Sequence, residues 1–145
     1  MYDFKALFQQ FKSIRVGVIG DIMLDTYMWG NVDRVSPEAP VPIVALDHKE
    51  YRIGGAGNVA LNLRSLQAQT FVLSVTGNDE DAKKLAELLI NEHLNPEFVI
   101  KSNSRITTSK TRVISRNQHM LRLDSEITNE LNQQDEGTLI KLFDQ

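Results

Sequence analysis

Residues 51–68 read YRIGGAGNVALNLRSLQA, with glycines at 54, 55 and 57 and an asparagine at 58 ahead of a helical pattern. Glycine inside a helix or strand costs about 0.5–1 kcal/mol relative to alanine, so the cluster indicates that another group approaches the backbone closely. The N–H groups of Gly54, Gly55 and Gly57 can meet a polar ligand, and the amide of Asn58 can both donate and accept hydrogen bonds. A ligand rich in hydroxyl groups, such as a sugar, needs this combination.

Two other interpretations of the glycines stay open at this point. The run from Gly55 to Ala60 fits the dinucleotide pattern G-x-G-x-x-A, but that motif must directly follow a buried strand, and the preceding DHKEYRI is charged. The acidic residue that such a site needs about 20 positions later would be Asp79 or Glu80. Asn78 or Asp79 also suits the cap of the following helix. Alternatively, the glycines form a turn that lets the helix pack tightly.

Charged residues elsewhere could complete a site for a phosphorylated sugar. Asp25 lies just beyond the first predicted strand, where open α/β sheets bind ligands, and its carboxylate could accept hydrogen bonds from two adjacent hydroxyls. On an extended strand, one face carries Lys110, Arg112, Ile114 and Arg116. That face is either a phosphate-binding surface or an ordinary solvated one.

The elements that would position these residues alternate along the chain. The apolar run at 14–20 predicts a buried strand of a parallel sheet. Helices are expected from 58 and over 80–93, and strands over 70–75 and 97–100. This order of strands and helices predicts a right-handed parallel α/β sheet.

Two segments interrupt this order. Residues 26–46 contain three prolines and predict two short edge strands joined by the loop SPEAP. Residues 106–124 predict an antiparallel hairpin around Arg116, Asn117 and Gln118, paired with the first segment. Short helices are also expected over Phe4–Phe11, from its apolar spacing, and after Thr128.

Composition narrows the class of protein. The chain has 145 residues, is 41% hydrophobic, carries a net charge of −3 and contains no cysteine, which excludes disulfides and thiolate metal sites. No basic excess points to nucleic acid, and no apolar run approaches the ~20 residues that span a bilayer. The three histidines are scattered, so no metal site is expected. A cytoplasmic protein is the default expectation.

Taken together, these segments resemble the ribokinase-type (PfkB) carbohydrate kinases, and more narrowly the heptose 7-phosphate kinase portion of ADP-heptose synthases. The resembling stretches are VGVIGDIMLDTYMWG, RVSPEAPVPIV, GGAGNVALNL and TTSKTRVISRNQHMLRLD, which span Val16–Asp124 in the family's order and spacing. The stretch GGAGN is shared by sugar kinases in general. Its combination with SPEAPVP and KTRVISRNQ is specific to the heptose kinase branch.

The resemblance implies an α/β fold: the N-terminal part of a ribokinase-like doubly wound sheet, with a small β-lid built from residues 26–46 and 106–124. In the family, this lid closes over the sugar and often pairs two subunits, so a homodimer is implied. The implied reaction, with ATP and Mg²⁺, phosphorylates the anomeric hydroxyl of D-glycero-D-manno-heptose 7-phosphate for lipopolysaccharide core synthesis. The substrate-binding residues that the resemblance implies are Asp25, Gly54, Gly55 and Asn58 for the sugar, and Lys110, Arg112, Asn117 and Gln118 near its phosphate.

The sequence departs from the family at its catalytic motif. The family's base is the aspartate of a G-A-G-D motif late in the chain, whereas Gly137 is the only glycine after Gly77. We therefore expect residues 1–145 to be a partial kinase domain that lacks its C-terminal half, with its ATP-binding loops, and is inactive alone. The alternatives are a ribokinase-type kinase for another sugar, or a non-catalytic module that binds a sugar phosphate and dimerises.

Overall fold

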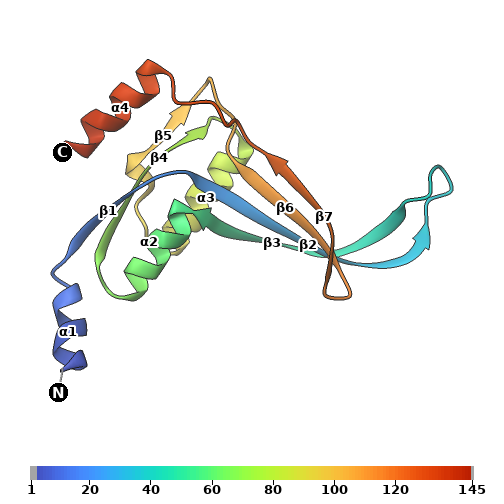
Figure 1. The fold of residues 1–145 in the computed structure, drawn as a ribbon, viewed down its shortest axis with the longest axis horizontal. Coiled ribbons are helices and arrows are strands. Elements are labelled where there is room, and N and C mark those ends of the chain that lie inside the picture. Colours follow the sequence, from blue (N-terminus) through green and yellow to red (C-terminus); the bar gives the residue numbers. More distant parts are fainter. Residues whose placement is uncertain (1–2, 145) are drawn as a thin grey trace.

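A computed structural model describes residues 3–144. The chain divides into a body of helices around a small sheet and a long, twisted sheet that extends away from it (Figure 1). We call the long sheet the lid; it consists of β2, β3, β6 and β7. The elements in chain order are α1 (Phe4–Phe11), β1 (Arg15–Ile19), β2 (Ile22–Val35), β3 (Pro42–Gly55), α2 (Ala56–Ser65), β4 (Gln69–Gly77), α3 (Glu80–Asn91), a 3₁₀ turn (Pro96–Phe98), β5 (Val99–Ser102), β6 (Ser109–Ser115), β7 (Gln118–Ser125) and α4 (Gln133–Phe143).

The body sheet has the strand order β1-β4-β5, and both of its pairings are parallel. The predicted α/β order is therefore confirmed. Leucines of α3 and Ala60 of α2 pack with the first residues of β2 and with Val72 of β4, which gives one core shared by the body and the base of the lid. The buried core residues are Ile22, Leu24, Ile53, Ala60, Val72, Leu85, Leu89 and Leu94.

The lid sheet has the order β3-β2-β6-β7. Strand β2 pairs antiparallel with β3 and parallel with β6, and β6 pairs antiparallel with β7. The predicted hairpin and its pairing with the segment after the first strand are confirmed. Because the long strands alternate their side chains, each lid residue belongs to one of two faces, which differ in chemistry.

The prediction of two short edge strands was wrong for the length of both strands and for the position of β2, whereas β3 does lie at the edge of the sheet. Strands β2 and β3 have 14 residues each, and β2 lies inside the sheet between β3 and β6. The charged stretch DHKEYRI, which argued against a strand before the glycines, lies within β3. Its charges suit a strand whose polar face carries His48, Glu50 and Arg52, while the core receives Ile53. The prolines stay outside the paired region or start β3.

The first strand is less buried than predicted. Ile19 of β1 is 54% exposed, because β1 lies at an edge of the body sheet and pairs with β4 on one side.

The helix expected over Phe4–Phe11 is present and is capped by the Asp3 carboxylate, which accepts the N–H of Ala6 at 3.0 Å. The last helix begins at Gln133, capped by Asn132, a few residues later than the sequence suggested. None of the helices within residues 3–144 is long and apolar enough to span a membrane.

Candidate sugar-phosphate site

The glycine stretch is the junction between β3 and α2. Gly55 has a φ of +59°, and a side chain there would strike the carbonyl of Asp21, whose oxygen accepts the N–H of Ala56 at 2.8 Å. A side chain at Gly54 would strike the Asp25 carboxylate, and one at Gly57 would strike Ile22 and Ile53. The close approach inferred from the glycines is therefore real. It includes packing inside the protein, in addition to the access that a ligand would need.

The strand that precedes the glycines also excludes the dinucleotide-binding interpretation of this motif. The strand ahead of the glycines is a lid strand that runs antiparallel to β2, whereas the dinucleotide motif needs a parallel strand of a βαβ unit. The carboxylate of Asp79, the acidic residue considered for that role, caps α3 and is bound to Thr107. Asn58 lies within the first turn of α2, since the helix begins at Ala56.

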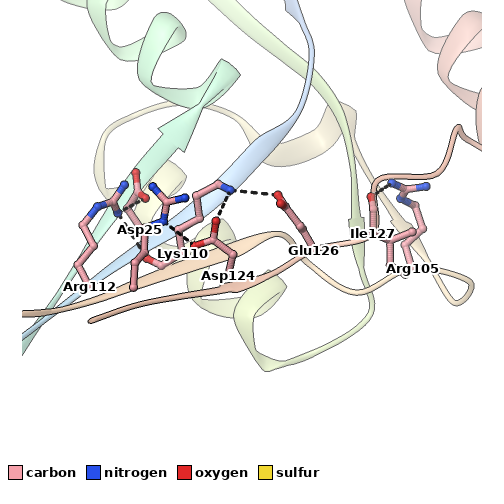
Figure 2. Close-up of polar contacts among 8 residues, drawn as sticks. Asp25, Arg105, Lys110, Arg112, Asp124, Glu126 and Ile127 are labelled. Atoms are coloured by element: carbon pink, nitrogen blue, oxygen red, sulfur yellow. Dashed lines mark hydrogen bonds and ion pairs between the residues drawn. The ribbon is translucent and has the colours of Figure 1, made fainter. Parts of the chain in front are cut away.

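Asp25 and Arg112 form an ion pair on the lid. Asp25 lies on β2 and Arg112 on β6, 87 residues apart in sequence, and Arg112 Nη1 donates to Asp25 Oδ1 at 2.6 Å (Figure 2). Their side chains are only 18% and 20% exposed. The hydrogen bond to Asp25 is the main cause that raises the pKa of Arg112, against partial burial, which lowers it. The structure thus brings the predicted sugar-binding carboxylate and a predicted phosphate-binding cation into direct contact.

Tyr27 lies beside this pair. The Arg112 guanidinium carbon is 5.1 Å from the centre of the Tyr27 ring, and that of Arg52 is 4.6 Å from it. Arg52 lies on β3 directly opposite Asp25. Sequence reasoning missed both residues. For Arg52, nothing in DHKEYRI marks one of its charges as facing a site formed by two other strands.

Lys110 is held by two carboxylates. Its Nζ donates to Asp124 at 3.1 Å and to Glu126 at 3.0 Å (Figure 2), and these hydrogen bonds raise the pKa of Lys110, with Glu126 as the larger cause. The pKa of Asp124 is lowered, chiefly by its hydrogen bond from Lys110, and Asp124 also pairs with Arg122 at 3.0 Å. The lid face on which we predicted a cluster of cations is therefore a network in which each cation already has a carboxylate partner.

The remaining predicted residues lie at the far end of the hairpin. Arg116 and Asn117 form its turn, with φ of 48° and 62°, and Gln118 begins β7. Arg116 was predicted to share the strand face of Lys110, but β6 ends at Ser115, so Arg116 lies in the turn, where it meets Asp33 at 3.6 Å. At about 3.3 Å per strand residue, Asn117 is about 17 Å along the chain from Arg112. The structure does not bring the tip residues to Asp25, and their role near the sugar phosphate stays a prediction.

A cavity of about 410 Å³ lies where the lid joins the body. Polar groups in its wall come from Asp21, Ser74, Arg105 and Glu126. Arg105 donates to the carbonyl of Ile127 at 2.8 Å (Figure 2) and to those of Asn129 and Glu130 at 3.0 and 3.4 Å. These hydrogen bonds tie together the segments that enter and leave the hairpin. No pattern in the sequence marks Arg105 for this role, because the residue stands in the loop SNSRI.

The described residues do not assign a site for the phosphoryl donor. Among residues 3–144, no group of three or more histidine, aspartate or glutamate side chains could hold a metal ion. The sequence likewise contains no G-A-G-D motif, the motif in which the family resemblance places the catalytic base.

Solved structures that superimpose on this chain include sugar kinases. A putative sugar kinase from Clostridium perfringens superimposes with a TM-score of 0.66 at 16% identity, over 90% of this chain and 40% of that one. The ribokinase of Arabidopsis thaliana, solved with ribose and ATP, superimposes with a TM-score of 0.61 at 17% identity, over 77% of this chain and 35% of that one. The architecture is therefore part of the ribokinase-like fold, because the chain covers 35–40% of these solved structures.

Sequence comparison identifies the family. Residues 13–145 match the family described as pfkB family carbohydrate kinase, and the chain belongs to this family. The chain is 42% identical to the bifunctional protein HldE of Geotalea uraniireducens over 130 residues, which cover 90% of the chain and 26% of that protein. It is 48% identical to the bifunctional protein HldE of Helicobacter hepaticus over 115 residues, 79% of the chain and 24% of that protein. The chain thus spans about a quarter of the length of these relatives.

Proposed function

We propose that this chain is the acceptor-binding part of a kinase that transfers the ATP γ-phosphate to the anomeric hydroxyl of D-glycero-D-manno-heptose 7-phosphate, in the synthesis of ADP-heptose. Membership of the pfkB family supports the sugar kinase class. The similarity to proteins named HldE, together with the stretches SPEAPVP and KTRVISRNQ, supports the heptose branch. The observation that carries the proposal is the Asp25 carboxylate, which lies against the Gly54 backbone and within hydrogen-bond distance of Arg112.

Each of these groups suits one part of the acceptor. The Asp25 carboxylate accepts hydrogen bonds from sugar hydroxyls, and the Gly54–Gly55 backbone with the Asn58 amide offers donors and an acceptor for the others. Arg112 supplies a planar cation for the phosphate on the sugar. Because phosphoryl transfer depends on positioning and charge stabilisation at the γ-phosphate, this chain alone would bind the acceptor without turning it over.

Calorimetric titration of the chain with heptose 7-phosphate, paired with a coupled assay of ADP release, tests the proposal. We expect saturable binding, its loss in Asp25→Asn, and no ADP release from the chain alone. Tighter binding of another sugar phosphate would favour a ribokinase-type kinase with a different substrate. Turnover by the chain alone would contradict the view that it supplies only the acceptor side.

The other face of the lid supports the proposal that two chains pair through it. Met28 of β2 lies beside Val113 of β6, which lies beside Leu121 of β7, on the face opposite Asp25 and Tyr27. Together with Val44, Leu46 and Met120 they line an apolar groove of about 510 Å³. Leu46 and Leu121 are 48% and 53% exposed. Contiguous exposed apolar surface marks interaction sites, and two lids placed face to face would cover it.

A further inference from the structure

We propose that Met23 is a specificity-determining residue of the sugar site, which selects among sugars by the configuration of their hydroxyl groups. Its thioether side chain offers an apolar surface next to groups that bind hydroxyls, so a sugar must turn a C–H face toward it. A sugar with a hydroxyl at that place binds more weakly, because the hydroxyl loses water without gaining a hydrogen bond. This inference rests on the proposed function, because it concerns the same site.

The start of β2 divides its side chains between two faces. Ile22 and Leu24 point into the core, where they are 2% and 1% exposed. Because side chains alternate along a strand, Met23 and Asp25 lie on the other face. Asp21, which precedes the strand, lines the same cavity as Met23. Along the chain, the apolar side chain of Met23 therefore comes between two carboxylates that can accept hydrogen bonds from hydroxyls.

The glycines of the β3–α2 junction leave room for Met23. Met23 lies directly opposite Gly54 in the pairing of β2 with β3. A side chain at Gly54 would strike Met23, and one at Gly55 would come within 3.0 Å of its terminal methyl group. The half-buried Met23 side chain thus lies across the backbone to which the proposed function assigns the sugar hydroxyls.

A sugar ring held by Asp25 reaches Met23. The two residues are about 7 Å apart along the strand, a distance that a pyranose ring with its substituents bridges. A methionine side chain is flexible and polarizable, so it can fit closely against the C–H groups of such a ring. It offers no strong partner to a hydroxyl, because a thioether sulfur is only a weak acceptor.

Three polar side chains across the cavity are already bonded within the protein. Ser74 accepts a backbone N–H at 3.1 Å, Arg105 donates to three backbone carbonyls, and Glu126 accepts from Lys110 at 3.0 Å. These groups are therefore not free partners for a hydroxyl turned toward Met23. The penalty for placing a hydroxyl there is thus set mainly by Met23 itself.

Selectivity among epimers tests the proposal. D-glycero-D-manno-heptose 7-phosphate and its epimers at C2, C3 and C4 are titrated calorimetrically into the wild type, Met23→Gln, Met23→Thr and Met23→Leu. Glutamine and threonine place a hydrogen-bonding group at this position, whereas leucine keeps it apolar at similar volume. Met28→Gln is the matched control, because it makes the same chemical change on the opposite face of β2. Thermal unfolding reports whether each variant is folded, and Met23→Thr serves should Met23→Gln not fold.

We expect the wild type to bind the manno form about 10- to 100-fold more tightly than at least one epimer, the range over which an apolar pocket rejects an added hydroxyl. Met23→Gln and Met23→Thr should reduce this ratio by about 10-fold at one carbon, because the new group can pair with the hydroxyl there. The ratios at the other two carbons should stay unchanged. Met23→Leu and Met28→Gln should keep all three wild-type ratios.

The Met23 proposal and the proposed function fail in different ways. If the wild type binds heptose 7-phosphate but its ratios persist in folded Met23→Gln or Met23→Thr, or fall equally in Met23→Leu, the Met23 proposal is overturned and the proposed function stands. If the wild type ignores heptose phosphates, and the ratio between mannose 6-phosphate and one of its epimers depends on Met23 in the expected way, the heptose assignment is wrong and the Met23 proposal stands. A wild type that binds all epimers equally, or binds no sugar phosphate, overturns the Met23 proposal.

Discussion

The Asp79 carboxylate joins the start of α3 to the base of the lid through Thr107. Asp79 Oδ2 accepts the N–H of Thr107 at 2.8 Å, while Oδ1 accepts the Thr107 hydroxyl at 2.7 Å and the N–H of Ala82 at 2.9 Å. The Thr107 hydroxyl in turn accepts the N–H of Gly77 at 3.1 Å. Because Thr107 lies two residues before β6, this cluster fixes where the strand that carries Arg112 begins.

Asp79→Ala should destabilise the chain by about 2–3 kcal/mol, since it removes a helix cap and leaves buried polar groups of Thr107 unpaired. Urea unfolding followed by circular dichroism measures the change. The matched control is Glu80→Ala, one residue along: its side chain is 86% exposed and pairs with the exposed Lys83, so its effect should stay within about 0.5 kcal/mol. Equal losses in the two variants would contradict the role given to Asp79.

The same carboxylate should make stability depend on pH in the acid range. Partial burial raises the pKa of Asp79, but the hydrogen bonds from Thr107 and Ala82 together outweigh it and lower the pKa below the ordinary 3.8. A lowered pKa means that the stabilisation is complete above 3.8 and is lost as the pH falls through the folded-state value. The stability gap between the wild type and Asp79→Asn should therefore shrink from about pH 5 to about pH 2. A gap that stays constant or widens on acidification would argue against this assignment.

The glycines at the β3–α2 junction allow a controlled comparison. Gly55→Ala should destabilise by about 1–3 kcal/mol, because φ is +59° and the Asp21 carbonyl occupies the space of the new methyl group. Gly137→Ala makes the same chemical change in α4, where no atom lies within 4 Å of the added carbon, and should stabilise by up to about 1 kcal/mol. The changes in the free energy of unfolding relative to the wild type should therefore have opposite signs in the two variants. A stabilising effect of Gly55→Ala would contradict the strained turn.

Local patterns in the sequence predicted the body better than the lid. The apolar runs of β1 and β4 and the spacing of Leu85 and Leu89 in α3 carry their own periodicity, so their order and parallel pairing could be read directly. The lid strands were recognised as extended, but their length was underestimated because a two-faced strand tolerates the charges of DHKEYRI. Contacts such as Asp25–Arg112 join residues 87 positions apart, and their register depends on three strands at once, which no local pattern encodes.

Pairing through the apolar face of the lid should be visible in solution. If two lids cover each other, light scattering during gel filtration gives a mass near twice the 16.4 kDa of one chain. Leu121→Glu places a charge in the apolar groove and should yield the mass of one chain. Arg122→Gln, next along β7 but on the opposite face, should leave the wild-type mass unchanged. A wild type with the mass of one chain at high concentration would remove the basis for this pairing.

Arg105 should control the motion of the lid hairpin more than its overall fold. It is the tie between the segment that enters β6 and the segment that leaves β7, through carbonyls at Ile127, Asn129 and Glu130. Arg105→Gln loses a charge-assisted contact, so amide hydrogen exchange in β6 and β7 should speed up by about 10-fold, while α3 and β4 keep their protection. Arg116→Gln is the control, because its pair with Asp33 spans 3.6 Å and both side chains are highly exposed. Faster exchange throughout the body would mean that Arg105 stabilises the whole fold, and unchanged exchange in the hairpin would mean that other contacts, such as Lys110 with Glu126, suffice to hold it.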